Sequence, residues 1–503
     1  MTHEPEKSDL PIVPMKLANK ARRLAAELVE GRGGAEGNAT LQSTVRTQSR
    51  AAVSQAQGRI REAVNRKRKE RLTALLHHVS VDVLRAAFLA LKRRAAPGID
   101  AVTWEAYEEE SEAKLRSLHE RLHAGAYRAL PSRRVYIPKP DGRQRPLGIA
   151  ALEDKIVQAA VVMILTPIYE AEFLGFSYGF RPGRGQHDAL DALAFGIKGR
   201  NISWILDADI RSFFDSISHD WLIRFLEHRI GDRRIIRLIQ KWLKAGVLDQ
   251  GSHVETEEGT PQGAVISPLL ANVYLHYVYD LWAEAWRRRH ATGDMILVRY
   301  ADDTIAGFQH ERDATRFLND LKERLAKFAL DLHPAKTRLI AFGRFVADRG
   351  RARGDGKPET FDFLGFTHIC GTKRKRDGRG RHHFQLIRRT KRERKWATIR
   401  TIKMELRRIQ HEPIDDQGRK LASMLRGHYA YFAVPTNLAA VRVVRHHVKV
   451  RWYLRLGRRS QRRRLTWRRM NVLAEKFLPV PTVQHPWPEQ RFLVRHRRQE
   501  PDA

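Results

Sequence analysis

The stretch that most constrains this chain runs from residue 295 to residue 308, because it places two adjacent carboxylates between two short apolar segments. The residues before Asp302 and Asp303 alternate in the manner of a strand, and those after them return as a second strand. Adjacent like charges repel, so a bound cation explains the pair better than folding does. Aspartate is also common in hairpin turns, and this pair alone leaves both explanations open.

The composition points to a polyanionic partner. The chain has 503 residues, with 93 Lys+Arg against 57 Asp+Glu and a formal charge of +36. This excess indicates nucleic acid, with a membrane surface as the weaker alternative. The single cysteine, Cys370, excludes a disulfide framework and a cysteine-based zinc site. No signal peptide or long apolar run is found, so we expect no membrane partner and a cytoplasmic location, in a prokaryotic cytoplasm or nucleoid.

A second group of acids lies earlier in the chain, in the segment from residue 204 to residue 215. The predicted order over residues 203–342 is strand, helix, insert, strand, strand, helix, strand, which is the split β-α-β or ferredoxin-like unit. Its first and third strands lie side by side, so Asp209 is expected to face Asp302 and Asp303. The neighbouring Asp207 and Asp215 are expected to be structural or to support the site.

Basic and glycine-rich segments accompany these acids. Residues 133–149 predict a hairpin with Lys139, Arg143 and Arg145 at its tip and flank, which suits a triphosphate but equally fits a solvated loop. Residues 175–185 interleave glycines, aromatics and arginines, as a loop does that approaches a nucleic-acid strand. Residues 72–92 and 103–124 predict two amphipathic helices.

Three carboxylates at adjacent strand ends, beside a basic finger, fit two divalent ions. Carboxylate and phosphate oxygens favour Mg²⁺, for which Mn²⁺ is a substitute. The residues therefore indicate nucleotidyl transfer in a basic cleft.

Five sequence blocks, in order, resemble a known family. Tyr300-Ala-Asp-Asp303, together with Asp209 and the Phe213-Phe-Asp215 run, resembles the palm of reverse transcriptases. Residues 178–184 (YGFRPGR), 261–268 (PQGAVISP) and 363–366 (FLGF) resemble blocks of group II intron-encoded reverse transcriptase/maturases, and residues 427–467 resemble their maturase or thumb region. The resemblance covers about residues 60 to 500, and the order of the blocks makes it specific.

The resemblance implies an α+β fold of the right-hand polymerase type. It divides the chain into a basic N-terminal extension (1–70), fingers (71–200), a ferredoxin-like palm (201–370), a basic α-helical thumb or maturase (X) domain (371–470) and a Pro-rich basic tail (471–503). The tail could retain a DNA-binding segment. The lone cysteine and the short tail predict that the C-terminal endonuclease of many relatives is lacking, so the primer would come from elsewhere.

The resemblance also implies roles for individual residues. The metal ligands and catalytic residues would be Asp209, Asp302 and Asp303, with the backbone carbonyl of Ile210. The residues that bind the incoming dNTP would be Lys139, Arg145, Phe214 and Gln262, with Phe214 excluding ribonucleotides. The residues beside primer and template would be Tyr300, Arg181, Lys336, Phe363, Leu364 and Gly365.

The expected function is that of an RNA-directed DNA polymerase encoded by a group II intron. It would copy intron RNA into DNA and, as a maturase, bind that RNA to assist splicing and mobility. Its partners would be the intron RNA, an RNA template with a DNA primer, target DNA and dNTPs; the oligomeric state is open. Two alternatives remain: a splicing cofactor without polymerase use, and a host-adopted reverse transcriptase in defence or repair. The intact acids and Gln262 speak against the first of these.

Overall fold

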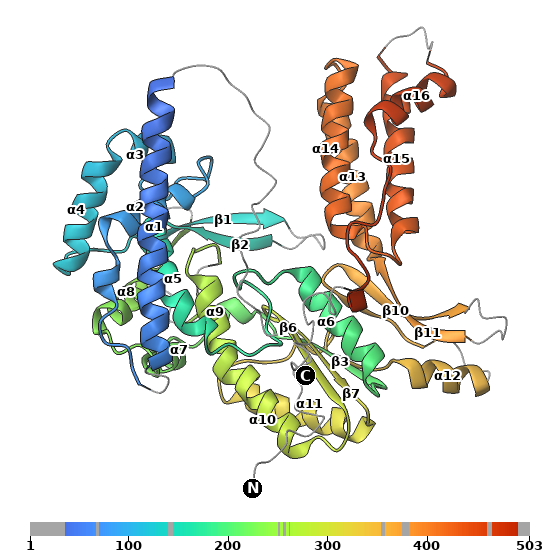
Figure 1. Ribbon diagram of the computed structural model, residues 1–503, viewed down its shortest axis with the longest axis horizontal. Helices are drawn as coiled ribbons and strands as arrows, with labels where there is room; N and C mark the ends of the chain where they lie inside the picture. The colour runs from blue at the N-terminus through green and yellow to red at the C-terminus, as the bar shows by residue number, and fades with distance from the viewer. Residues whose placement is uncertain are drawn as a thin grey trace, which may run out of the picture.

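The computed structural model describes residues 36–66, 70–138, 144–249, 252–254, 258–260, 262–353, 358–374, 382–459 and 465–490. The N-terminal helices and a C-terminal helical bundle rise on opposite sides of a central sheet (Figure 1). Helices and sheets occur in both halves, which agrees with the predicted α+β class. Among the described residues, no helix is both long and apolar enough to span a bilayer.

The N-terminal part is a helical layer, and its bounds differ from the prediction. Its helices are α1 (Glu36–Arg66), α2 (Val81–Ala90), α3 (Trp104–Glu108), α4 (Ser111–His123) and α5 (Leu152–Glu170). The helix predicted for residues 72–92 is wrong in its first half, because Ser80 caps α2 by accepting a hydrogen bond from the Val83 amide. The helix predicted for residues 103–124 is two helices, because Glu110 leaves helical geometry at φ −124° and ψ 29°.

A small sheet lies next to this layer. Its strands are β1 (Ser132–Pro138), β2 (Gln144–Ile149), β4 (Val247–Asp249) and β5 (Ser252–Val254), in the order β2-β1-β4-β5. The antiparallel β1–β2 pair confirms the predicted hairpin. β4 joins β1 in parallel, at Ser132 opposite Val247, and so ties the hairpin to a segment more than a hundred residues away.

The central sheet has the predicted topology. Its strands are β3 (Trp204–Asp209), β6 (Met295–Tyr300), β7 (Asp303–Phe308) and β8 (Arg338–Ala341), in the order β6-β7-β3-β8. β3 and β7 are antiparallel neighbours, which confirms that the first and third strands of the unit lie side by side. Two helices pack on the sheet: α6 (Gln186–Gly199) on β6, and α11 (Glu311–Ala326) on β3 and β7.

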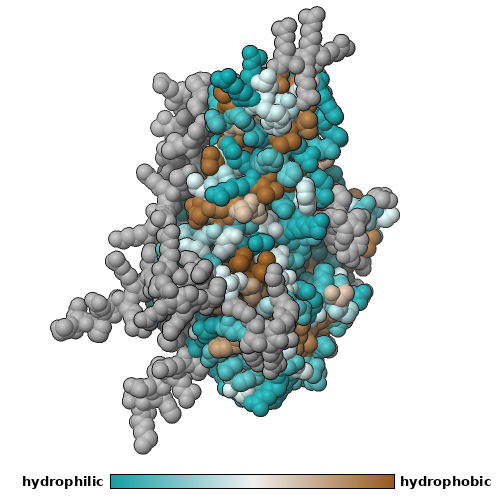
Figure 2. Space-filling view, turned by 90° about the vertical axis from the view of Figure 1, so that its right-hand side faces the viewer, coloured by the Kyte–Doolittle hydropathy of each residue, from teal (hydrophilic) through white to brown (hydrophobic). Residues whose placement is uncertain are grey.

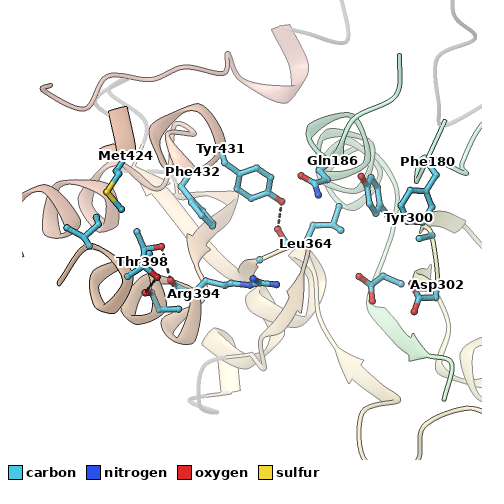
Figure 3. Close-up of a pocket in the computed structure, with 16 residues that line it drawn as sticks. Phe180, Gln186, Tyr300, Asp302, Leu364, Arg394, Thr398, Met424, Tyr431 and Phe432 are labelled. Atoms are coloured by element: carbon cyan, nitrogen blue, oxygen red, sulfur yellow. Dashed lines mark hydrogen bonds between the residues drawn. The ribbon is translucent and has the colours of Figure 1, made fainter. Parts of the chain in front are cut away.

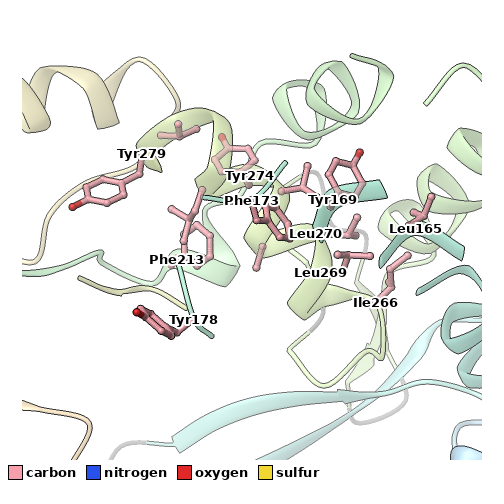
Figure 4. Packing of buried hydrophobic residues seen from close by; sticks show 14 of the residues in the cluster. Leu165, Tyr169, Phe173, Tyr178, Phe213, Ile266, Leu269, Leu270, Tyr274 and Tyr279 are labelled. Atoms are coloured by element: carbon pink, nitrogen blue, oxygen red, sulfur yellow. The ribbon is translucent and has the colours of Figure 1, made fainter. Parts of the chain in front are cut away.

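The connection from β3 to β6 is helical. It contains α7 (His219–Glu227), α8 (Arg233–Lys244), α9 (Ser267–Leu275), a π-helical turn (His276–Asp280) and α10 (Leu281–His290). One hydrophobic core joins these helices, the N-terminal layer and the central sheet. Figure 4 shows part of it, where side chains of α5 such as Leu165 and Tyr169 pack with Leu269 and Leu270 of α9. The core therefore gives the central sheet a rigid support.

The C-terminal part begins with a second small sheet. Helix α12 (Arg344–Arg353) precedes the strands β9 (Phe361–Phe363), β10 (Phe366–Arg374) and β11 (His382–Thr390), which lie in the order β11-β10-β9. The bundle then consists of α13 (Arg392–Arg408), α14 (Ile414–Phe432), α15 (Leu438–Leu456) and α16 (Trp467–Phe477). These helices bury a core of their own around Trp452.

Candidate active site

The turn between β6 and β7 brings the predicted acids together with the end of β3. In the register of the sheet, Asp209 lies opposite Asp303, and Tyr300 lies opposite Asp303 on the other side. Asp302 stands in the turn itself, after Ala301, whose φ of 56° is in the left-handed region. The long-range prediction that residue 209 meets residues 302 and 303 is thus confirmed at the level of the backbone.

Burial, with mutual repulsion added, raises the pKa of Asp302 and Asp303. Burial is the first cause that raises the pKa of Asp303 to about 7, and the charges of Asp302, Asp209 and Asp207 add to it. Burial likewise raises the pKa of Asp302, and Asp209 contributes. Asp303 is exposed by its solvent-accessible area, and the protein atoms packed around its carboxylate cause the desolvation. A cation placed among these groups would remove the repulsion.

Lys336 supplies a positive charge at this point. Its Nζ lies 2.7 Å from Oδ2 of Asp209, and the loop that carries it is tied to β3, because the His333 amide donates to the Asp209 carbonyl at 2.8 Å. Ile210 is buried and bridges to Leu332. The backbone hydrogen bonds of this bridge are accepted by the carbonyls of Asp209 and Asp331, so the Ile210 carbonyl takes no part in them.

The donor set fits a hard divalent ion in its chemistry. All three side chains offer carboxylate oxygens, which Mg²⁺ and Mn²⁺ prefer. In the described residues, no three His, Cys, Asp or Glu side chains converge closely enough to hold a metal ion in this conformation. In this conformation the Asp209 carboxylate is paired with the Lys336 ammonium.

A pocket of about 700 Å³ opens beside the acids. Figure 3 shows Asp302 and Tyr300 on one wall and Arg394, Thr398 and Met424 on the other. Leu364 and Gly365, at the turn between β9 and β10, also line this pocket; their place beside the primer stays a prediction. The Tyr431 hydroxyl donates to the Leu364 carbonyl at 2.7 Å and so holds this turn against α14.

The far wall of the pocket was missed by sequence analysis. It consists of residues from α13 and α14: Arg394, Ala397, Thr398, Thr401, Ile402, Met424, Tyr431 and Phe432. The only available signal was the basic helical pattern after residue 391, which does not say which face of a helix turns toward the acids.

The predicted nucleotide-binding residues form a second cluster. Arg145 Nε donates to Gln262 Oε1 at 2.8 Å, and the Gly148 amide donates to the Gln262 carbonyl at 2.7 Å. Phe214 is half-buried, and its carbonyl accepts from the Thr260 amide at 2.8 Å. Lys139 and Arg143 lie outside the described residues. The structure therefore places Arg145 and Gln262 together and ties Phe214 to the loop before Gln262.

Two predicted primer or template residues need correction. The Arg181 side chain is only 2% exposed and pairs with Glu170, and it also donates to the carbonyls of Leu174 and Ser177. Its guanidinium braces the loop from within and is not available to a nucleic-acid strand in this conformation. Phe363 is buried in the core, so only Leu364 and Gly365 of that block face the pocket.

The two supporting acids differ in their surroundings. Burial raises the pKa of Asp207 to about 6, and the charge of Arg338 opposes that rise. Asp215 lines a pocket of about 260 Å³ together with Gly148, Thr260 and Gln262. Neither residue lines the larger pocket, and neither does Asp209; the supporting roles of Asp207 and Asp215 stay a prediction.

Comparison with known proteins identifies the domain that contains this site. Residues 137–368 match the family described as reverse transcriptase (RNA-dependent DNA polymerase). The chain is 41% identical to the protein YkfC of Escherichia coli over 256 residues, which are 44% of this chain and 66% of the relative. It is 43% identical to the group II intron-encoded protein LtrA of Lactococcus lactis over 167 residues, which are 33% of this chain and 28% of the relative.

A third relative is the nuclear intron maturase 1 of Arabidopsis thaliana, which is 32% identical over 92 residues, 18% of this chain and 13% of the relative. The matches cover less than two thirds of each of these relatives. The reverse transcriptase domain contains all three acids of the site, and the relatives include proteins of group II introns and intron maturases. Residues 137–368 therefore form a reverse transcriptase domain, and this part of the chain is similar to group II intron-encoded proteins and intron maturases.

Proposed function

We propose that this chain is an RNA-directed DNA polymerase that extends a DNA primer on an RNA template. The observation that carries the proposal is the register of the central sheet, which sets Asp209 opposite Asp303 and next to Asp302. The reverse transcriptase match over residues 137–368 supports it. Asp209, Asp302 and Asp303 are the residues that would hold two divalent ions, Mg²⁺ or Mn²⁺.

The architecture supports an assignment of fingers, palm and thumb. The helical layer with the β1–β2 hairpin corresponds to fingers (71–200), the central sheet to a palm (201–370) and the bundle α13–α15 to a thumb or maturase domain (371–470). The N-terminal extension (1–70) contributes α1 to the helical layer, and the tail (471–503) includes most of α16. Because the 700 Å³ pocket lies between the palm acids and α13–α14, the thumb forms one wall of the site.

The chemistry follows from the charges on the site's own residues. When bound, the divalent ions lower the pKa of the attacking primer hydroxyl and stabilise the charge on the transferred phosphate. Strands β3 and β7 belong to the core and therefore keep the three carboxylates in fixed positions, as in-line attack requires. Lys336, now paired with Asp209 at 2.7 Å, is placed to move toward substrate phosphate when a cation takes its position.

Recognition of the incoming dNTP falls to the small sheet and its neighbours. Arg145 and Gln262, which bond to one another at 2.8 Å, approach the site from the hairpin side. Arg145 carries a fork of donors that matches phosphate oxygens, and Lys139 would add a second cation. The Phe214 ring, next to the acidic end of β3, is proposed to exclude a 2′-hydroxyl by contact.

The primer side is proposed to be the larger pocket. Tyr300, Leu364 and Gly365 lie near the acids, and Arg394 extends into the space between the two walls (Figure 3). A guanidinium there fits a primer phosphate. The primer end would thus be held between the palm and the first thumb helix.

The maturase role is proposed from the family and the charge. Helix α13 exposes Arg392, Arg394, Arg400, Lys403, Arg407 and Arg408. Such a concentration of cations on one helix binds the backbone of RNA without sequence preference. The intron RNA, and target DNA during mobility, are the partners that this surface fits. A splicing cofactor without polymerase use would retain the basic helices but would not need the acids.

Primer extension tests the proposal. The wild-type protein should extend a DNA primer on an RNA template with Mg²⁺, and Asp302→Ala or Asp303→Ala should abolish extension while RNA binding persists. Asp207→Asn is the matched control, since Asp207 lies on the same strand as Asp209, opposite Arg338, and is expected to support the site without holding an ion. Undiminished synthesis by the Asp302 or Asp303 variants would refute the assignment of the acids.

A further inference from the structure

The turn that carries Asp302 and Asp303 rests on a fully buried arginine. Arg299 is the second-last residue of β6, and both its side chain and that of Asp280 are inaccessible to solvent. A charged pair without water is expensive unless every donor and acceptor is satisfied. Arg299 can therefore be buried here only if all of its N–H groups find hydrogen-bond acceptors.

That condition is met in full. Arg299 Nε and Nη2 donate to the two carboxylate oxygens of Asp280 at 2.7 and 2.6 Å, and Nη2 also donates to Ser177 Oγ at 2.7 Å. Nη1 donates to Asn272 Oδ1 at 3.0 Å and to the Ala301 carbonyl at 2.9 Å. All five N–H groups of the guanidinium are used, one of them on the backbone of the acidic turn.

The partners of Arg299 come from three separate elements. Asp280 ends the π-helical turn, Asn272 lies on α9 and Ser177 lies in the loop before α6. A π-helical turn inside a long helix is rare and is often found at functional sites. Here the extra residue of the turn brings the Asp280 carboxylate under β6.

The loop that contains Ser177 also contacts the acidic turn between β6 and β7 directly. The Tyr178 amide donates to the Arg299 carbonyl at 2.8 Å, and the Asn272 side-chain amide donates to the Gly179 carbonyl at 2.7 Å. A Cβ at Gly179 would lie 2.2 Å from the Ala301 amide nitrogen. Ala301 therefore has its left-handed backbone enclosed by Gly179 and held by the Arg299 bond to its carbonyl.

We propose that Arg299 is a positioning residue for the active site: it fixes the Ala301 peptide and thereby the direction in which Asp302 and Asp303 point. This role rests on the proposed function of the two acids. A positioning role and a purely structural role predict different results. If Arg299 positions the turn, loss of its bond to Ala301 should lower the metal affinity of the turn even where the fold is intact.

The direct test compares Arg299→Lys with Arg229→Lys. Lysine keeps the charge beside Asp280, but its single ammonium cannot reach Asp280, Asn272, Ser177 and Ala301 together. Arg229 is the matched control, because it is also buried and paired, and its partners Glu172 and the Glu70 carbonyl lie outside the acidic turn. Asn272→Ala is a milder variant that keeps the ion pair and removes one bond at Nη1, together with the Asn272 bond to the Gly179 carbonyl.

Three readouts are used, two of which need no catalysis. The Mn²⁺ affinity of the protein by calorimetry and the hydrogen exchange of amides 301–303 are measured first. In Arg299→Lys the Mn²⁺ affinity should fall about 10- to 100-fold, as it does when a residue that orients a metal ligand is lost, and the amides should exchange faster. Primer extension should show a similar fall in kcat with the KM for dNTP nearly unchanged, and Asn272→Ala should be intermediate.

The outcomes separate this inference from the proposed function. If the wild-type protein shows no primer extension, the proposed function fails, while Mn²⁺ affinity and exchange still decide on Arg299. Wild-type affinity and exchange in a folded Arg299→Lys protein would overturn the positioning role, as would equal losses in Arg229→Lys. If Arg299→Lys does not fold, Asn272→Ala decides: unchanged affinity and exchange overturn the role, and intermediate losses support it.

Discussion

Single residues at this site show both what sequence patterns reveal and what they hide. The acids were predictable, because carboxylates after apolar strands have no folding role and the strand order sets which ends meet. Arg181 was misplaced, because an arginine in a glycine-rich loop reads as a nucleic-acid contact, whereas here it neutralises Glu170 and binds carbonyls inside the loop. Arg394 was not singled out, because a basic helix offers many equivalent cations.

The first prediction concerns Phe214 and the choice of sugar. Phe214→Ala should raise ribonucleotide incorporation by about tenfold or more, which corresponds to roughly 1.4 kcal/mol of lost discrimination. The reason is steric: removal of the ring leaves room for a 2′-hydroxyl. The measurement is the ratio of kcat/KM for rNTP to that for dNTP. Phe345→Ala on α12 is the control, because Phe345 is not one of the predicted dNTP-binding residues. An unchanged ratio would show that another group selects the sugar.

Elements were predicted unequally, for physical reasons. The central sheet follows from strand periodicity and from one rule of topology, and its strand order is as expected. The parallel addition of β4 to β1 could not be predicted, because β4 has three residues and its pairing depends on a contact distant in sequence. The π-helical turn leaves no mark in an apolar helical pattern, although it places Asp280 beneath Arg299.

The second prediction concerns the β9–β11 sheet and pH. Burial lowers the pKa of His368 to about 3, and its ring stacks on Phe361 at 4.7 Å. The unfolded chain binds a proton near pH 6.5 and the folded chain does not, so stability is lost as pH falls from 6.5 toward 3. The loss is about 1.4 kcal/mol per pH unit in that window.

His368→Phe should remove this component, because phenylalanine stacks in the same place and does not titrate. The free energy of unfolding, measured by denaturant titration between pH 7.5 and pH 5, should fall less steeply in the variant than in the wild-type protein. Parallel pH curves for the two proteins would contradict the assignment.

The molecule as a whole has two hydrophobic cores, and Phe432 of α14 packs against both of them. The bundle α13–α16 has its own hydrophobic core. The buried Arg388–Asp191 pair links β11 to α6, and Lys198 Nζ of α6 lies 2.6 Å from Glu489 in the segment after α16. The face shown in Figure 2 is mainly hydrophilic, with apolar side chains in small separate groups. Such a face suits a wet, charged interface with RNA.

The third prediction follows from the formal charge of +36. The affinity for intron RNA should fall on the order of a hundredfold or more between 50 mM and 200 mM salt, because binding to many phosphates releases counterions. Filter binding or fluorescence anisotropy across this range measures the slope. The Asp303→Ala protein should show the same slope, because an aspartate carboxylate makes no contact with RNA phosphate. A salt-independent affinity of the wild-type protein would contradict the charge argument.

The most direct measurement of the central claim is the number of Mn²⁺ ions held by the complex with primer, template and a non-reactive dNTP, counted by electron paramagnetic resonance. The wild-type protein and Asp207→Asn should each bind two ions, and Asp209→Asn and Asp303→Asn should each bind fewer. If Asp209→Asn and Asp303→Asn both kept the wild-type count and affinity, the ends of β3 and β7 would not share the ions, and this account of the site would be wrong.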